Sequence, residues 1–198
     1  MSIAGPSEAT TSGPRNAQKT RERILEAGRI CFSRNSYENV GIRELAQMAG
    51  VTGALVNRYF GNKETLFVEV IQGAFRLDEH LPASLDELGH FLVSSIMAAG
   101  NPEEDGFNAL RLLILATGSP GTSALVSERF HAEFVESLAQ RLKGRNAQVR
   151  AATIASYVIG LATMRHLLLS PLLASPSANV AAKLAASSIQ DCVIPPVT

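Results

Sequence analysis

Side chains able to bond to a nucleic acid gather in the stretch VTGALVNRYFGNKETLF, residues 51 to 67. The amide of Asn57 can bond to adenine at two atoms, and the guanidinium of Arg58 can bond to guanine or grip a phosphate. The hydroxyl of Tyr59 can donate a hydrogen bond to a phosphate oxygen. These residue types at this spacing therefore favour recognition of a nucleic acid.

Lys63 is the first residue of the next predicted helix, after a break at Gly61 and Asn62. A helix N-terminus carries positive partial charge and favours anions, so a lysine there breaks a local rule. Such departures are expected at functional sites. Because the free N–H groups of a helix start bind phosphate, we interpret Lys63 as part of a phosphate clamp; a solvated surface lysine is the alternative.

The short helices that must position these side chains are predicted from Ala46, Gly50 and Val56. A helix-turn-helix needs a small residue where its helices cross, a glycine that can take positive φ in the turn, and an aliphatic residue facing inward. Thr52 is placed to cap the second helix, and Phe60 would hold that helix to the core together with Val56. The residues left on the outer face are Gly53, Ala54, Asn57 and Arg58.

A plain helical hairpin would have the same spacing of apolar residues. The outer face favours a DNA-reading helix instead. Gly53 and Ala54 are small enough for the start of the helix to approach a groove, and Asn57 and Arg58 can then reach the base edges.

Charge is divided unevenly along the chain. The 198 residues have a formal net charge of zero. Residues 15–63 contain nine Lys and Arg against four Glu, a net charge of +5, and the remainder carries −5. This asymmetry indicates that one end of the protein faces a polyanion.

Neither the first residues nor the cysteines indicate export or a membrane. Residues 1–14 are rich in Ser, Thr, Gly and Pro, so we expect a disordered leader and not a signal peptide. The apolar run at 151–164 is too short to span a bilayer and is expected to be a buried helix. Cys31 and Cys192 lack metal-ligand spacing, and we interpret them as reduced thiols of a cytoplasmic protein.

Apolar residues recur at helical spacing in nearly every segment, with no alternating strand pattern and no glycine-rich phosphate loop. Beyond the two short helices, helices are predicted over residues 16–34, 63–80, 84–98, 107–117, 123–143, 146–169 and 177–190. Ser84 and Glu87 form a predicted capping box. The prediction is an all-α protein of about nine helices, with a helix-turn-helix head at 15–62 and a larger helical domain at 63–198, whose first helix, 63–80, links the two.

Residues from about Thr20 to Phe67 resemble the DNA-binding domain of the TetR family of bacterial transcriptional regulators. The matching stretches are RILEAGRICF, SYENVGIRELAQMAGV and ALVNRYFGNKETLF. The resemblance implies a three-helix DNA-binding head and a C-terminal domain that dimerises and usually holds an effector pocket. The DNA contacts that it implies are Arg43, Thr52, Asn57, Tyr59 and Lys63.

Three positions depart from the family pattern. Gly41 stands where Thr or Ser is common, so a hydroxyl that would touch phosphate is lost. Asn57 replaces a frequent Tyr, which favours base reading or a weaker anchor there. Ser36 replaces a frequent glycine at the end of the first helix.

Small residues are dense in the last two predicted helices and would let a neighbouring helix approach closely. They are Ala151, Ala152, Ala155, Ser156, Gly160 and Ala162 in one helix, and Ala181, Ala182, Ala185 and Ala186 in the other. We predict that the two helices form a four-helix homodimer interface, which matches an inverted-repeat operator. Burial inside one subunit is the alternative.

A ligand pocket needs apolar walls and a few polar groups. Candidates within the apolar segments are His90, Phe107, Asn108, Arg111, Thr117, Tyr157, Met164 and His166, with Phe91, Met97, Leu113 and Phe134 as further walls. Each could equally be an ordinary core or surface residue. Arg111, within ALRLLILA, could pair with an anionic effector or with an acidic residue across an interface.

Together these features predict a homodimeric repressor that binds double-stranded DNA and is released by a small-molecule effector, with no cofactor, metal or catalytic site. The effector would act by favouring another spacing of the two heads. The alternatives are a regulator without an effector, a helical enzyme with an incidental hairpin, and an interaction protein that does not bind DNA. No acid–base constellation supports the enzyme, since His131 with Glu133 is an isolated pair.

Overall fold

The computed structural model describes residues 14–76, 81–82, 84–98 and 107–194. Within these ranges every regular element is a helix, which confirms the predicted all-α fold. The predicted disordered leader lies outside the described residues except for Pro14, which begins the first helix.

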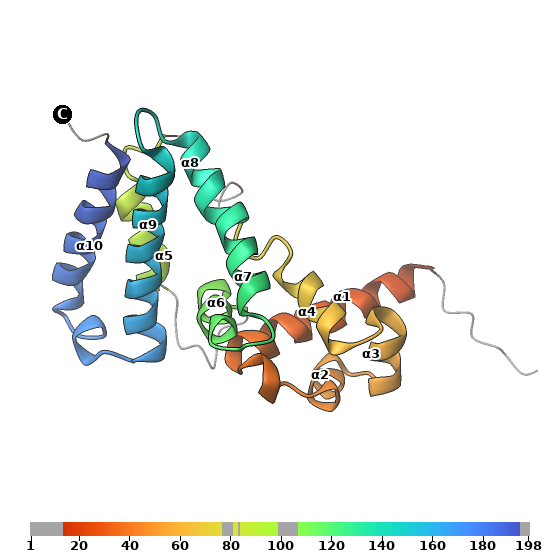
Figure 1. Cartoon of the computed structure of the whole chain (residues 1–198). Coiled ribbons are helices and arrows are strands. Elements are labelled where there is room, and N and C mark those ends of the chain that lie inside the picture. Colours follow the sequence, from red (N-terminus) through yellow and green to blue (C-terminus); the bar gives the residue numbers. More distant parts are fainter. Residues whose placement is uncertain (1–13, 77–80, 83, 99–106, 195–198) are drawn as a thin grey trace, which may run out of the picture.

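Four α-helices form the N-terminal head (Figure 1). They are α1 (Pro14–Arg34), α2 (Ile42–Ala49), α3 (Gly53–Phe60) and α4 (Lys63–Ile71), with a 3-10 helix, η1 (Tyr37–Asn39), between α1 and α2. The apolar residues Ile24, Ala27, Cys31 and Phe32 of α1 are buried, and α1 packs against both α2 and α4. An aromatic cluster of Phe32, Tyr37 and Phe67, with ring centroids 5.0–5.8 Å apart, closes the core of the head.

The remaining described residues form the C-terminal part. Its α-helices are α5 (Leu88–Ala98), α6 (Ala109–Thr117), α7 (Ser123–Phe130), α8 (Ser137–Arg141), α9 (Ala147–Ala162) and α10 (Ala178–Val193). The π-helical segment η2 (His131–Glu136) joins α7 to α8 as one continuous helix, so the described residues contain nine α-helical rods, as predicted. A second π-helical segment, η3 (Thr163–Leu167), extends α9, and a 3-10 helix, η4 (Pro171–Leu173), precedes α10.

Helices α5, α9 and α10 stand side by side at one end of the molecule, whereas α6 and α7 lie between them and the head (Figure 1). The head contacts the C-terminal part mainly where α1 packs on α6. The hydroxyl of Ser119, just after α6, also donates a hydrogen bond of 2.5 Å to the carboxylate of Glu38 in η1, and this bond lowers the pKa of Glu38.

The linking helix is shorter than predicted, because α4 ends at Ile71 and not near His80. Gly73 has a φ of 74°, a conformation that L side chains rarely adopt and that a helix cannot continue through. The carboxylate of Glu133 accepts hydrogen bonds from the backbone N–H groups of Gly73 at 2.9 Å and Phe75 at 3.1 Å. Periodicity within 63–80 does not reveal this contact, because Glu133 lies 60 residues from Gly73.

The capping box predicted for the next helix is also wrong, since α5 begins at Leu88. The Ser84 hydroxyl accepts a hydrogen bond from the N–H of Asp86 at 3.2 Å and donates one of 2.6 Å to the Asp86 carboxylate. Ser84 therefore caps a local turn instead of the helix.

Helix α10 packs closely against α5 within the same subunit. A Cβ atom at Gly89 would lie 2.0 Å from the carbonyl oxygen of Ala186, so only glycine allows this approach. The Gln190 side chain accepts from the N–H of Gly89 and donates to the carbonyl of Leu85, both at 3.0 Å. The alanines of α10 that pack against the core are Ala182, Ala185 and Ala186. For these residues the structure supports burial inside one subunit.

Candidate nucleic-acid interface and ligand cavity

The turn between α2 and α3 has the geometry that the sequence predicts. Gly50 has φ 63° and ψ 40°, in the left-handed region, and the N–H of Val51 bonds to the carbonyl of Ala46 at 2.9 Å. The Thr52 hydroxyl caps α3 by accepting from the N–H of Leu55 at 3.3 Å. On the inner face of α3, the predicted anchors Val56 and Phe60 are buried.

An arginine that sequence reasoning missed holds this turn to α1. The Arg23 guanidinium donates from Nε to the carbonyl of Ala49 at 3.0 Å and from a terminal nitrogen to the carbonyl of Gly50 at 2.9 Å. These carbonyls end α2, where a cation is favourable. In the sequence, Arg23 is one of several polar residues along α1, and this pattern does not predict the contact.

The outer face of the helix-turn-helix presents donors to solvent. Arg43, Ala54, Asn57 and Arg58 are exposed, while Gly53 and Tyr59 are half-buried. Within the described part of the chain, the side chains of Arg43, Asn57 and Arg58 have no hydrogen bond or ion pair to another residue. Donors that the protein leaves unbonded on one surface are available to an external acceptor.

The structure explains the lysine at the start of α4 in a way that the sequence does not show. Lys63 Nζ donates hydrogen bonds to the carbonyl oxygens of Tyr37 at 2.9 Å and Val40 at 3.1 Å, and lies 4.3 Å from the centroid of the Tyr37 ring. The carbonyl oxygens at the end of η1 carry negative partial charge, so they stabilise the ammonium group of Lys63 although the start of α4 is electrostatically unfavourable for a cation. The face of the Tyr37 ring adds a cation–π contact. An ammonium group has three donors, so these two bonds leave one N–H of Lys63 that no carbonyl of the described residues accepts.

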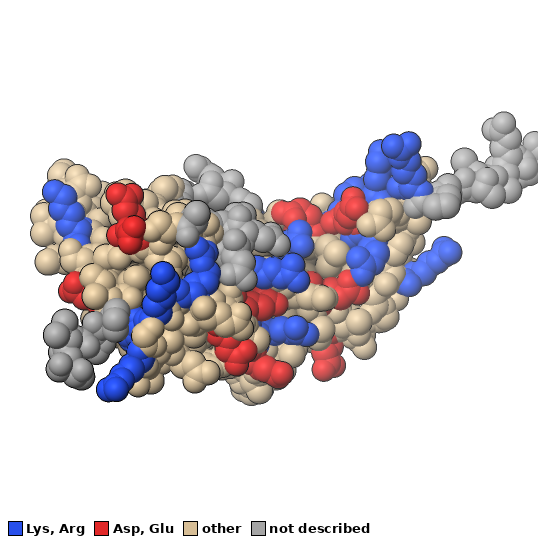
Figure 2. Space-filling model, turned by 90° about the horizontal axis from the view of Figure 1, so that it is seen from above, with Lys and Arg blue, Asp and Glu red and all other residues tan. Residues whose placement is uncertain are grey.

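Figure 2 shows basic side chains at both ends of the molecule, with acidic side chains among them. The end that holds the head has the excess of positive charge, because residues 15–63 carry a net charge of +5. A polyanion would meet this end first, because the summed field of the remaining chain is negative.

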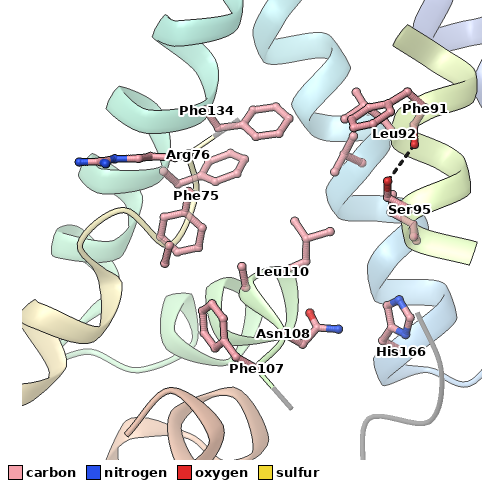
Figure 3. A pocket seen from close by; sticks show the side chains of 15 residues that line it. Phe75, Arg76, Phe91, Leu92, Ser95, Phe107, Asn108, Leu110, Phe134 and His166 are labelled. Atoms are coloured by element: carbon pink, nitrogen blue, oxygen red, sulfur yellow. Dashed lines mark hydrogen bonds between the residues drawn. The ribbon is translucent and has the colours of Figure 1, made fainter. Parts of the chain in front are cut away.

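A cavity of about 390 Å³ lies between the residues after α4 and helices α5, α6, α7–η2 and α9–η3 (Figure 3). Its walls are mostly apolar and include five phenylalanines. Two pairs of these rings are in contact, Phe75 edge-on to Phe130 and Phe130 stacked on Phe134. The remaining aromatic walls are Phe91 and Phe107. The polar lining residues are Arg76, Ser95, Asn108 and His166. A volume of this size with few polar groups is typical of a small-molecule site.

Three of the eight predicted pocket residues, Phe107, Asn108 and His166, line this cavity, as do the predicted walls Phe91 and Phe134. The other five do not line it, and neither do the predicted walls Met97 and Leu113. The five are His90, Arg111, Thr117, Tyr157 and Met164.

Local geometry explains why these residues lie away from this cavity. His90 is exposed on α5 and its Nδ1 lies 3.4 Å from the Ser94 hydroxyl. Thr117 is exposed at the end of α6, where its hydroxyl donates to the carbonyl of Ile114. Tyr157 and Met164 lie on the outer face of α9–η3, 42% and 43% exposed. Apolar helical segments leave the direction of each side chain open until the neighbouring helices are known.

Arg111 does not line the cavity, but it interacts with two residues that do, Asn108 and His166. Its backbone N–H donates to Asn108 Oδ1 at 2.9 Å, which makes Asn108 the cap of α6. Its Nε atom is buried without a hydrogen-bond partner among the described residues. Burial lowers the pKa of the His166 imidazole below its ordinary 6.5, and the nearby charges of Arg165 and Arg111 lower it further, against a hydrogen bond to the Ile96 backbone.

Among the described residues, no three His, Cys, Asp or Glu side chains come together as a metal site would need. In the same part of the chain, no helix has both the length and the apolar character required to cross a bilayer.

A helix-turn-helix with unbonded donors on its second helix, joined to a helical body with an apolar cavity, is the architecture of a DNA-binding transcriptional regulator. Residues 24–70 match the family model of bacterial regulatory proteins, tetR family, and residues 86–193 match the tetracyclin repressor-like C-terminal domain. The second match alone covers more than half of the chain. The chain therefore belongs to the TetR family.

Relatives support the same assignment over part of the chain. The chain is 34% identical over 68 residues to the transcriptional repressor AcnR of Corynebacterium glutamicum, covering 34% of this chain and 32% of the relative. It is 29% identical over 133 residues to the transcriptional regulator UidR of Escherichia coli K12, covering 64% of this chain and 66% of UidR. The matched stretch thus spans about a third of the length of AcnR.

Solved structures share the fold at low identity. NalD, the secondary repressor of the MexAB-OprM multidrug efflux pump in Pseudomonas aeruginosa, superimposes with a TM-score of 0.61 at 18% identity, covering 89% of this chain and 97% of NalD. Salmonella enterica GusR gives 0.59 at 17% identity, covering 92% and 96%. At such identities the likeness concerns the fold alone.

Proposed function

We propose that the protein is a homodimeric, sequence-specific transcriptional repressor that a small-molecule effector releases from an inverted-repeat operator. The observation that carries the proposal is the exposed face of α2 and α3, where Arg43, Asn57 and Arg58 make no side-chain bonds within the described protein. Residues 15–62 then act as the DNA-binding domain, and residues 63–198 as the effector-binding and dimerisation domain.

On DNA, α3 enters the major groove with its N-terminus leading. Ala54 is exposed there and small, so it allows close approach, while Asn57 and Arg58 reach the base edges. Phosphate contacts come from Thr52 at the helix cap, from Tyr59 and from the third donor of Lys63. These contacts orient the head, and the two base-reading side chains supply the sequence preference.

The first experiment is selection of bound sequences from random DNA with the full-length chain, followed by gel shifts over a salt series. Arg58→Ala is expected to weaken binding to the selected site by about 1–3 kcal/mol and to relax the preference at one base pair. Arg145→Ala is the matched control, because Arg145 is an exposed arginine of the C-terminal part. Equal affinities of the two variants, or selection of no preferred sequence, would contradict the proposal.

The dimer interface is proposed on the outer faces of α9 and α10. Large apolar side chains are exposed on both, Val149 and Tyr157 on α9 and Val180 and Leu184 on α10, each between 42% and 67%. Of the small residues predicted to line this interface, Ala151, Ala155 and Ala162 are buried inside the subunit, so they do not contribute. Ala152, Ser156 and Gly160 are exposed on the outer face of α9 and remain candidates for close helix approach.

Sedimentation velocity of the full-length chain tests this interface. Leu184→Glu places a charge on the exposed apolar face of α10 and is expected to convert a dimer into a monomer. Gln140→Glu adds the same charge at an exposed position of α8 and should leave the dimer intact. A wild-type monomer at micromolar concentration, or a dimer that survives Leu184→Glu, would exclude this interface.

The effector is proposed to bind the cavity lined by Phe75, Phe107, Phe134, Asn108 and His166. Its volume of about 390 Å³ lies within the range of small-molecule sites, which favours an effector over a regulator with a fully packed core. An effector changes DNA affinity only if it binds the DNA-free arrangement of the heads more tightly. Residues 74–76, which follow α4, line the cavity and are joined to the head, so they are the proposed lever.

A further inference from the structure

The cavity has one apolar end and one polar end (Figure 3). Phe75, Phe134, Phe91 and Leu92 surround the apolar end, whereas the side chains of Asn108 and His166 lie across from each other at the other end. Arg76 is a lining residue, but its guanidinium points away from the cavity in the same view. The Ser95 hydroxyl also lines the cavity but already donates to the carbonyl of Phe91 at 3.0 Å. A ligand therefore meets its polar partners at Asn108 and His166.

Asn108 offers a donor to this polar end. Its Oδ1 atom is occupied as the cap of α6, because it accepts from the N–H of Arg111 at 2.9 Å. The amide nitrogen therefore faces the other way, and in Figure 3 it is directed toward His166. An amide nitrogen carries two N–H donors and no acceptor.

His166 offers an acceptor. The residue is 5% exposed, and the Ile96 backbone acts on its pKa as a hydrogen-bond acceptor does, which places a ring N–H toward the Ile96 carbonyl. Burial, and after it the charges of the neighbouring Arg165 and Arg111, lower the pKa of the imidazole and so favour its neutral form. In a neutral imidazole the second nitrogen carries a lone pair and accepts.

We propose that the effector is an uncharged, flat aromatic molecule carrying a hydroxyl group that accepts from the Asn108 amide and donates to the His166 imidazole. This inference rests on the proposed function, since it names the class of effector that binds the same cavity. A hydroxyl is the smallest group that both accepts and donates, so it satisfies both side chains at once. The phenylalanine walls favour flat rings through stacked and edge-on contacts.

Other ligand classes leave one of these groups unsatisfied. A carboxylate would be attracted by the charges of Arg111 and Arg165, but it accepts and does not donate, so it would face the lone pair of neutral His166. An ammonium group would enter a region where Arg111 and Arg165 already act on His166 as positive charges. A hydrocarbon would cover the Asn108 amide without bonding to it, which costs about 1–3 kcal/mol.

The test measures binding of four probes to the full-length chain by calorimetry: 4-phenylphenol, biphenyl, biphenyl-4-carboxylate and 4-(aminomethyl)biphenyl. We expect 4-phenylphenol to bind at least tenfold more tightly than each of the others. Tighter binding of biphenyl-4-carboxylate, or of the amine, would overturn the proposal, as would equal binding of the phenol and biphenyl. Absence of 4-phenylphenol binding to a chain that still binds its selected DNA would overturn it as well.

Asn108→Asp separates the donor from the cap. An aspartate keeps the oxygen that caps α6 but replaces the amide donor with a second acceptor, so the helix should remain while the tenfold preference for the phenol over 4-(aminomethyl)biphenyl disappears, because an ammonium group can donate to both acceptors and a hydroxyl to only one. Asn62→Asp is the matched control, because Asn62 caps α4 by accepting from the N–H of Thr65 at 2.8 Å and lies outside the cavity. Retention of the full preference in Asn108→Asp would contradict the assigned role of the amide.

Gel shifts with the selected DNA test separately which class of ligand the cavity binds and whether that ligand acts as an effector. If 4-phenylphenol binds with the expected preference and also releases the DNA, both the ligand class and the effector role are supported. If it binds with that preference and leaves the DNA complex unchanged, the hydroxyl site stands and release by a ligand of this cavity is refuted.

Discussion

Glu133 on η2 accepts a hydrogen bond of 2.9 Å from the backbone N–H of Gly73, the residue at which the chain turns after α4. Its other carboxylate oxygen accepts from the N–H of Phe75 at 3.1 Å. The next residue on η2, Phe134, lines the cavity, and so does Phe75. One carboxylate thus joins the end of the head to two walls of the proposed effector site. π-Helical segments are frequent at functional sites, and this one places adjacent residues toward the turn and the cavity.

Removing the charge of this carboxylate should destabilise the turn. Glu133→Gln keeps one acceptor oxygen but replaces a charged acceptor of two N–H groups, so we expect a loss of about 1.5–3 kcal/mol in the free energy of unfolding, measured by urea denaturation. Glu136→Gln removes the same charge at an exposed position of η2 and should change stability by less than about 0.5 kcal/mol. Equal stabilities of the two variants would show that the contact contributes nothing.

Lys63 is expected to stabilise the head even when no DNA is present. Lys63→Met removes two hydrogen bonds to carbonyls and the contact with the Tyr37 ring, and the expected loss is about 1–3 kcal/mol in urea denaturation of the free protein. Lys19→Met, at an exposed lysine of α1, is the control. A free protein as stable as the control variant would mean that Lys63 serves only an external partner.

The close approach of α5 and α10 should not tolerate a methyl group. Gly89→Ala would place Cβ 2.0 Å from a backbone carbonyl, so the helices must separate, at an expected cost of about 1–3 kcal/mol in thermal or urea unfolding. Gly118→Ala is the matched control, because φ is −76° there and the added Cβ would meet its nearest neighbour at 3.6 Å. That variant should be neutral or gain about 0.4–1 kcal/mol. A stable Gly89→Ala variant would show that the packing of α10 on α5 differs in solution.

The two cysteines should differ in reactivity. Cys31 is 1% exposed, and burial raises the pKa of its thiol to about 11, so almost no thiolate forms at pH 8. Cys192 is half-buried, and its pKa is also raised by burial. Iodoacetamide labelling followed by mass spectrometry is expected to modify Cys192 first and Cys31 only after unfolding in urea. Faster labelling of Cys31 in the native protein would be inconsistent with its burial.

Stability should fall in acid partly through His166. Its pKa is lowered in the folded protein, so below pH 6.5 the unfolded chain binds the proton more readily than the folded chain. The contribution is therefore complete above pH 6.5 and is lost as pH falls from there toward the lower folded pKa. Urea denaturation at pH 8, 7, 6 and 5 should show a shallower fall for His166→Gln than for the wild type. His131→Gln, at an exposed histidine, should keep the wild-type pH dependence.

Local features of the head could be predicted because the interactions that specify them lie within a few residues. The cap of α3 by Thr52 spans three residues, the turn at Gly50 needs only a positive φ, and the burial of Val56 and Phe60 follows from helical spacing. The same reasoning predicted the end of α4 and the start of α5 wrongly. The chain turns after α4 where the distant Glu133 binds its backbone, and Ser84 caps a local turn instead of α5. A pattern of apolar residues shows neither interaction.

The residues that line the cavity could likewise be predicted only in part from the sequence. Phe107, Asn108 and His166 could be recognised as polar or aromatic residues in apolar segments, but so could Thr117 and Tyr157, which face solvent. Which face of a helix turns inward depends on the helices that pack against it, and those contacts join residues far apart in the chain.

The sequence by itself therefore determined the all-α class, the helix-turn-helix and the donors on its outer face, because helical periodicity, caps and turn glycines act over single turns of the chain. The tertiary structure decided where the linking helix ends, what Lys63 bonds to and which side chains meet at the cavity. Each of these depends on a contact between residues tens of positions apart, such as Glu133 with Gly73, and no local pattern records such a contact.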